Sequence, residues 1–478
     1  MQKAIFIDGL WVEPRSGQTR RIINPATAET ISEIGYGGRD EALAAAAAAH
    51  AAFEPWRQKT VYERAALLRM LADAIRSRQD DLAHILTMEV GKPLAESAGE
   101  IGAAADQFEW YAEEVKRSAG DVIPPRLANR RHLTIRHPVG PVAAITPWNF
   151  PVMLATRKMA PAMAAGCPVV VRPASQTPLA LIEVFRLLET IGFEPGVANL
   201  VVGHPGECSQ VFVEDDRIKK ISFTGSLAVG RELYTACAER MKKITLELGG
   251  HSPFVILPDI PLDEAVECAV FAKYRNMGQV CISASRFYIP NAVKAEFEER
   301  VVAAVSKLKI GDGRDPDTSV GPLFEEKRVQ ASMELINDLK AKGGKVLYGG
   351  SPPEGEAYAK GYFFMPTVVT DISNDMKIML EEPFAPIMPI IGYETVDEAI
   401  AMANDTPYGL AAYAMTRDLR FTVKLAEGLE AGIIGINDCA PSAAQCPFGG
   451  MKQSGVGREG WSQGLDAYYE TKYVSIGI

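Results

Sequence analysis

The spacing of apolar residues divides the chain into a helical first part and a longer part in which strands and helices alternate. In the first part apolar positions recur every three or four residues, which is the period of helices that bury one face. The alanine-rich stretch at 39–54 predicts a strong helix that ends at Pro55. The stretches at 61–79 and 106–120 predict two more helices.

From Pro138 onward short apolar strands alternate with helices, and a second such block runs from Leu262 to about Gly450. This alternation predicts parallel sheets covered by helices on both faces, with ligands at the carboxyl ends of the strands. The predicted strands are 141–146, 168–173, 198–203, 220–225, 243–248, 253–257, 286–290 and 365–370, and the predicted helices are 153–166, 179–192, 226–241, 262–276, 292–308 and 326–342.

Two segments outside these blocks, 130–138 and 470–478, alternate apolar and polar residues with a period of two. We interpret each as a strand that is isolated from the main pattern. An exposed strand edge pairs readily with another chain, so both segments indicate contacts between subunits.

Composition and charge narrow the possible functions. A chain of 478 residues with 47% hydrophobic and 23% charged residues predicts two or three globular domains. The net charge of −10 argues against nucleic acid or an anionic membrane as a partner. No apolar run is long enough to span a bilayer, and Asp8 interrupts any signal peptide. The chain has seven cysteines without a C-x-x-C pair and six histidines without paired spacing. We therefore expect no disulfides and no metal site, and a cytoplasmic location.

Two turns carry polar groups that could bind ligands. Asn149 in "TPWNFP" follows an apolar strand, so its amide is either a fixed hydrogen-bond donor or the cap of the next helix. Gly225 and Ser226 in "FTGSLAVG" open a helix where a pyrophosphate can bind, although an ordinary helix cap has the same pattern.

Two further segments carry candidate catalytic groups. Glu247 in "LELGG" lies in an apolar strand, where burial would raise its pKa toward that of a general base; the alternative is an exposed or ion-paired carboxylate. Cys281 in "AKYRNMGQVCISASRF" follows a glycine-bearing break after a helix, where a thiol can be presented and polarised. It is a candidate nucleophile, and packing is the alternative.

In this order, and followed by "EEPFAP" and "PFGGMKQSG", the segments resemble the aldehyde dehydrogenase superfamily, most closely its succinate-semialdehyde dehydrogenase branch. The resemblance covers the chain from "INPATAE" near residue 23 to its C-terminal strand. It implies an α/β fold with two Rossmann-like doubly wound parallel-sheet domains, a small β oligomerisation element, and a homodimer or homotetramer. The implied dinucleotide-binding domain comprises residues 1–119 and 141–248, and the implied catalytic domain residues 249–450. The implied oligomerisation element comprises residues 120–140 and 451–478.

The resemblance also implies catalytic roles. The Cys281 thiolate attacks the aldehyde to form a thiohemiacetal, and a thioester remains after hydride leaves for NAD(P). The Asn149 side chain and the backbone N–H of Cys281 form the oxyanion hole, and Glu247 activates water. The presence of Glu247 argues against a coenzyme A-acylating enzyme, which typically lacks it. A cofactor-free cysteine esterase and a non-catalytic structural protein remain as alternatives.

The implied cofactor site departs from the family pattern at its adenosine end. Arg172 stands where the family usually has lysine, and Ser175 where many NAD-preferring members have glutamate. A serine does not repel a 2′-phosphate and an arginine can pair with one, so NADP is expected to be accepted and preferred over NAD. Ala385 stands where the family usually has a glycine, and we give this difference no functional interpretation. The other implied contacts are Thr146, Pro147, Trp148, Gly225, Ser226, Leu248, Glu382 and Phe384.

The implied substrate is a semialdehyde with a distal carboxylate. Arg157 and Arg275 match the positions that hold this carboxylate, and Ser442 adds a hydroxyl, although most arginines in proteins are structural. Succinate semialdehyde is the first expectation; glutarate or 2-oxoglutarate semialdehyde, or a broader range of aldehydes, are alternatives. Ser283 stands where some succinate-semialdehyde enzymes carry a second cysteine, so a local disulfide switch is not expected.

Overall fold

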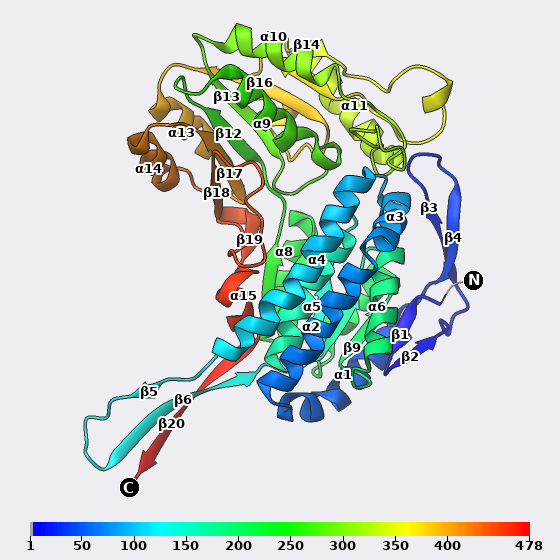
Figure 1. Cartoon of the computed structure of the whole chain (residues 1–478), viewed down its shortest axis with the longest axis vertical. Helices are drawn as coiled ribbons and strands as arrows, with labels where there is room; N and C mark the ends of the chain where they lie inside the picture. Colours follow the sequence, from blue (N-terminus) through cyan, green and yellow to red (C-terminus); the bar gives the residue numbers. More distant parts are fainter. Residues whose placement is uncertain (1–2) are drawn as a thin grey trace.

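A computed structural model describes residues 3–478 of the chain, which form two large α/β units and a projecting arm (Figure 1). The first unit is built on an eight-stranded sheet with the order β19-β11-β10-β7-β8-β9-β1-β2. Its five central strands are parallel, as predicted, and the strands at both edges are antiparallel. The strands are β1 (Ile5–Ile7), β2 (Leu10–Val12), β7 (Val142–Ile145), β8 (Val169–Arg172), β9 (Ala198–Val201), β10 (Lys220–Thr224), β11 (Lys243–Glu247) and β19 (Gly455–Val456).

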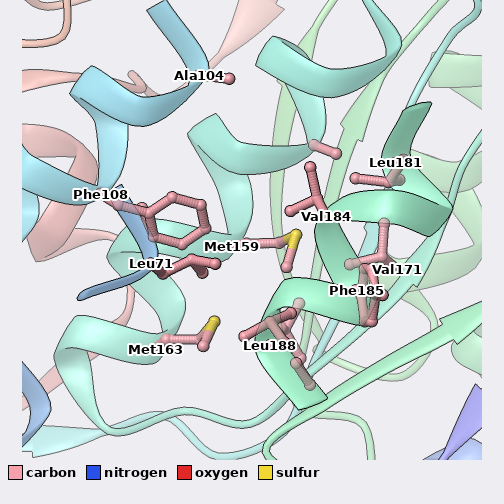
Figure 2. Packing of buried hydrophobic residues seen from close by; sticks show 14 of the residues in the cluster. Leu71, Ala104, Phe108, Met159, Met163, Val171, Leu181, Val184, Phe185 and Leu188 are labelled. Carbon is pink, nitrogen blue, oxygen red and sulfur yellow. The ribbon is translucent and has the colours of Figure 1, made fainter. Parts of the chain in front are cut away.

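Helices cover both faces of this sheet because successive strand residues point to opposite sides. Val171 of β8 packs against the helices α2, α4, α5 and α6, where Phe108, Met159 and Phe185 meet (Figure 2). Val170 packs on the other face against α1, α7 and α8. The helices are α1 (Arg39–Gln58), α2 (Val61–Ser77), α3 (Gln79–Val90), α4 (Leu94–Glu114), α5 (Pro151–Ala165), α6 (Leu179–Ile191), α7 (Pro205–Glu214), α8 (Leu227–Ala238) and α15 (Trp461–Asp466).

The sequence predicted that helix α1 ends at Pro55, but the helix continues to Gln58. Proline removes one backbone donor, which a helix tolerates only when other contacts compensate. Here Trp56 is fully buried and its indole N–H donates to the carbonyl oxygen of Met163 at 3.0 Å. Tertiary packing therefore holds the last turn. Sequence analysis also missed α7, the edge strands β1 and β2, and the hairpin of β3 (Thr19–Ile23) and β4 (Thr30–Gly35).

The second unit contains a seven-stranded sheet with the order β14-β15-β16-β13-β12-β17-β18, parallel except at β14. Helices α9, α10 and α11 pack on one face, and α13 and α14 on the other. Its strands are β12 (Ser252–Ile256), β13 (Ala284–Pro290), β14 (Lys345–Tyr348), β15 (Thr367–Thr370), β16 (Ile387–Tyr393), β17 (Ala411–Met415) and β18 (Ile433–Ile436). Its helices are α9 (Leu262–Tyr274), α10 (Lys294–Val305), α11 (Glu326–Ala341), α12 (Lys377–Leu380), α13 (Val396–Asn404) and α14 (Leu419–Gly428).

The projecting arm consists of β5 (Val122–Ile123), β6 (Arg130–Pro138) and β20 (Tyr469–Gly477), with the C-terminus at its tip (Figure 1). The two strands that the sequence left isolated pair with each other over nine antiparallel positions. The arm exposes large apolar side chains, among them Val122 and Tyr473. Strand β19, within the segment assigned by sequence to oligomerisation, pairs instead with β11 of the first unit. The division into domains stays a prediction.

Candidate active site

Two of the candidate catalytic side chains come from loops and one from the end of a strand. Asn149 precedes α5, Glu247 is the last residue of β11, and Cys281 lies between α9 and β13. Two cavities of about 420 and 590 Å³ share Cys281 and Leu154 in their walls. We call the smaller the cofactor cavity and the larger the substrate cavity. The fold therefore places the thiol where two separate ligands could reach it.

The loop that carries Cys281 is shaped by three consecutive residues in the left-handed region, Asn276, Met277 and Gly278, with φ of 46°, 55° and 68°. A Cβ atom at Gly278 would collide with the carbonyl oxygen of Ala385, so only glycine fits there. Cys281 is half-buried. Burial, aided by the negative charge of Glu382, raises the pKa of the Cys281 thiol to about 12. The sequence predicted a polarised thiol, and this prediction is wrong for the structure. The raised pKa favours the protonated thiol at neutral pH, so Cys281 has to lose its proton before it can attack.

Asn149 is buried and linked to the Cys281 loop. Its Nδ2 donates to the carbonyl oxygen of Gln279 at 3.0 Å, while its Oδ1 is buried without a partner. Its carbonyl oxygen accepts from Lys92 Nζ at 2.9 Å and from Asn276 Nδ2 at 3.3 Å. The residue before α5 is Phe150, and no side chain caps this helix. The interpretation of Asn149 as a helix cap therefore fails, and its amide points to the thiol loop.

Glu247 is 2% exposed, and both of its carboxyl oxygens are buried without a hydrogen-bond partner. Burial, together with the negative charge of Glu459, raises the pKa of Glu247 well above its usual range. Within the described residues it forms no ion pair, which excludes the ion-paired alternative. Sequence analysis missed the ion pair beside it, between buried Lys158 and Glu459; Lys158 Nζ also donates to Thr224 Oγ1 at 2.7 Å. A lysine in the apolar stretch "ATRKMAP" was the available signal.

The cofactor cavity has an aromatic wall. Trp148 stacks on Phe324 with ring centroids 4.2 Å apart and meets the edge of Phe384 at 5.6 Å. Phe384 has a φ of 46°, which is rare for a bulky residue. Ser226 caps α8 by accepting from the backbone N–H of Val229. Of the predicted cofactor contacts, Pro147, Trp148, Gly225, Ser226, Leu248, Glu382 and Phe384 line this cavity.

Glu382 is held at the floor of the cofactor cavity by a close approach of backbone. The N–H of Gly250 donates to Glu382 Oε1 at 3.1 Å, and a Cβ atom at Gly249 would collide with the carboxylate. Burial raises the pKa of Glu382 to about 7. Gly249 of "LELGG" therefore leaves room for this acid, and Gly250 donates a hydrogen bond to it. Ala385 is buried and has no positive φ, so the chain tolerates alanine here, but nothing in the structure gives it a function.

The remaining predicted cofactor contacts lie outside the cofactor cavity. Arg172, at the end of β8, donates from Nη2 to Ser175 Oγ at 2.9 Å and to the carbonyl oxygen of Gly203 at 3.0 Å. Its Nε is buried without a partner. The backbone N–H of Thr146 donates to the carbonyl oxygen of Arg172 at 3.1 Å. These three residues lie together at the carboxyl ends of β7 and β8, beside the end of β9, where a dinucleotide binds in folds of this kind.

The substrate cavity contains both predicted arginines. Arg157 is 3% exposed, and its Cζ lies 4.1 Å from the ring centroid of Phe448. Its Nη2 donates to Ser442 Oγ at 3.0 Å, while its Nη1 is buried without a partner among the described residues. Arg275 is half-buried between the rings of Phe150 and Phe271, each 5.8 Å away. Neither arginine has an acidic partner within residues 3–478. The structure thus unites Arg157, Arg275 and Ser442 with Cys281; the aromatic supports were missed, because only folding brings them there.

Across the described chain, no group of three or more His, Cys, Asp or Glu side chains could hold a metal ion. No helix within residues 3–478 combines the length and apolarity needed to cross a membrane. All seven cysteines are free thiols.

Comparisons with known proteins agree with this geometry. The sequence model described as the aldehyde dehydrogenase family matches residues 11–474. A 3-sulfolactaldehyde dehydrogenase of Pseudomonas putida is 43% identical, over 100% of this chain and 97% of the relative. An NADP⁺-dependent succinate-semialdehyde dehydrogenase of Escherichia coli is 44% identical, over 99% and 97%. The crystal structure of an E. coli NADP-dependent enzyme superposes with a TM-score of 0.97 at 43% identity, covering 100% of this chain and 98% of that one.

Proposed function

The chain belongs to the aldehyde dehydrogenase family, and from that premise we propose that it oxidises a semialdehyde carrying a carboxylate, first of all succinate semialdehyde to succinate. The enzyme is an oxidoreductase that acts on aldehydes with NAD(P)⁺. One observation carries the substrate class: Arg157 and Arg275 line the cavity of Cys281 and form no ion pair with any described residue. Glu247 and Glu96 interact with Arg157 and Arg275 only at longer range, so a substrate carboxylate would supply the direct partner that each guanidinium lacks.

The first chemical step requires a thiolate. Because burial raises the pKa of the Cys281 thiol, the thiol first loses its proton to solvent water in the open cavity and then reacts as the thiolate. The sulfur then bonds to the aldehyde carbon, and the carbonyl π electrons move to oxygen. One amide hydrogen of Asn149 is held by Gln279, which leaves the second for the oxyanion. The product of this step is a thiohemiacetal on Cys281.

NAD(P)⁺, when bound, supplies the acceptor for the hydride that leaves the thiohemiacetal carbon. The residues around the cofactor cavity fit such a ligand: Trp148 and Phe384 provide flat apolar faces, and Ser226 opens a helix toward it. A thioester then remains on Cys281. Glu247 accepts a proton from the water that attacks it, which releases the carboxylic acid and returns the thiolate. The Lys158–Glu459 ion pair acts on Glu247: the charge of Glu459 raises the pKa of Glu247, and the charge of Lys158 lowers it.

We propose that NADP⁺ is accepted and preferred. Ser175 places a hydroxyl rather than a carboxylate beside Arg172, and the two are hydrogen-bonded. Arg172 has no acidic partner in the described chain, so its positive charge is available to a 2′-phosphate. Glutarate semialdehyde is the second substrate candidate, since the substrate cavity of about 590 Å³ has room for a longer chain.

We further propose a homodimer or homotetramer in the cytoplasm. The exposed apolar residues of the arm support subunit contacts, and the free thiols suit a reducing compartment. The domain roles assigned by sequence, including 249–450 for catalysis, are part of this proposal.

The test is a steady-state screen of succinate semialdehyde, glutarate semialdehyde and butanal, each with NAD⁺ and NADP⁺. We expect kcat/KM for a carboxylated aldehyde to exceed that for butanal by roughly 30-fold or more, because a buried charged pair contributes about 2 kcal/mol or more. Equal values for the carboxylated and the uncharged aldehydes would contradict the proposed substrate class, though not the family.

A further inference from the structure

Gln107 is a buried amide in the wall of the substrate cavity to which no role has been given. It lies on α4, lines the cavity and is 2% exposed. Its Oε1 is buried and has no hydrogen-bond partner within the described chain. Leaving such a group unsatisfied costs about 1–3 kcal/mol, so a buried amide of this kind calls for a ligand.

Two acidic groups of this wall are already paired. Glu100 accepts from the backbone N–H of Val152 at 3.0 Å and pairs with Lys92. Asp106 pairs with Arg76 at 2.7 Å. Within the described chain, the fully buried polar atoms of this wall that lack a partner are Gln107 Oε1, which accepts a hydrogen bond, and Arg157 Nη1, which donates one; the half-buried Arg275 and the exposed Gln445 also line the cavity. A substrate carboxylate satisfies the arginine but cannot donate to the amide.

We propose that Gln107 binds a hydroxyl group on the carbon chain of the substrate, between the aldehyde held at Cys281 and the carboxylate held at Arg157. A hydroxyl both donates and accepts, so it matches the amide whichever way the amide is turned. Succinate semialdehyde has no such donor, whereas a hydroxylated semialdehyde of the same length does. The inference rests on the proposed function and narrows its substrate to hydroxylated semialdehydes.

The experiment compares kcat/KM for succinate semialdehyde with that for 2-hydroxy-4-oxobutanoate and 3-hydroxy-4-oxobutanoate, in the wild type and in Gln107→Leu. We expect one hydroxylated substrate to be about 10-fold better in the wild type, because an unmatched polar group in the site penalises the substrate without the hydroxyl. In Gln107→Leu the two rates should agree within about twofold, because leucine keeps the volume and removes the amide. Gln445→Leu is the matched control: Gln445 lines the same cavity but is exposed, so its variant should keep the preference.

Two outcomes would overturn the inference. The first is a wild-type enzyme that turns over neither hydroxylated substrate better than succinate semialdehyde. The second is a Gln107→Leu variant that retains the full preference while its turnover of butanal shows an intact catalytic site. Failure of the proposed function is a separate result, since it appears as equal wild-type turnover of butanal and succinate semialdehyde. The wild-type comparison stands even if the variant does not fold.

Discussion

Replacing Arg157 by leucine removes a buried guanidinium while keeping an apolar side chain against Phe448. Arg157 is 3% exposed and has one nitrogen without a partner, so a carboxylate bound there is shielded from water. Truncating one member of such a pair costs roughly 2–5 kcal/mol, or about 30-fold to several thousand-fold in kcat/KM. Arg275 is half-buried, so Arg275→Leu should cost less, about 1.5–3 kcal/mol or roughly 10- to 150-fold.

The assay is steady-state formation of NAD(P)H with succinate semialdehyde and with butanal. Butanal turnover should change little in both variants, because the chemistry at Cys281 is untouched. Arg420→Ala, which removes an exposed arginine paired with Asp418, is the matched control and should leave both substrates unchanged. An equal fall for succinate semialdehyde and butanal would show that the arginines are structural. A larger loss for Arg275 than for Arg157 would refute the argument from burial.

Four further predictions follow from the site and the arm. Glu247→Gln should release about one reduced nicotinamide per active site and then stall at the thioester, as seen in stopped-flow absorbance; unimpaired steady turnover would mean that another group activates water. Because burial raises the pKa of Glu247, its base form grows as pH rises, so kcat of the wild type should increase as pH rises above the usual range of a carboxyl group; a kcat that falls with rising pH would contradict the assignment. The ratio of kcat/KM for NADP⁺ to that for NAD⁺ should exceed one and should fall in Ser175→Glu, whose carboxylate repels the 2′-phosphate; a strong preference of the wild type for NAD⁺ would oppose this. Deleting the last ten residues removes all of β20, so light scattering should report a smaller assembly, and an unchanged mass per particle would count against the arm as a subunit contact.

Sequence analysis located the chemistry well where the signal was local. Asn149, Glu247 and Cys281 each stand at a turn or strand end within a short motif, and the structure brings them to one place. The state of the thiol could not be predicted, because the pKa of Cys281 depends on burial and on Glu382, which is distant in sequence. The Lys158 ion pair escaped notice for the same reason, since its partner is 301 residues away.

In the fold, too, features with a local sequence signal were predicted and features that depend on distant residues were not. The parallel strands of the first sheet, and β12, β13 and β15 of the second, were predicted because each is an apolar run bounded by turns. The parallel strands β16, β17 and β18 and the short edge strands β1 and β2 were not predicted. The end of α1 was misplaced because Pro55 was judged by its intrinsic preference, and the burial of Trp56 overrides that preference. Pairing between β6 and β20 links the two ends of a long intervening segment, which no local pattern reveals.

That pairing has a consequence for how the chain is made. Strand β6 leaves the ribosome about 330 residues before its partner β20. At the usual rate of translation, about 5–20 residues per second, its edge waits roughly 20 to 60 s for the strand that will cover it. During this interval the nascent chain carries an open template for strand addition, which invites premature association between neighbouring chains on one messenger. Arg130, Arg131 and Arg136 along β6 give that template like charges, which oppose the pairing of two nascent copies.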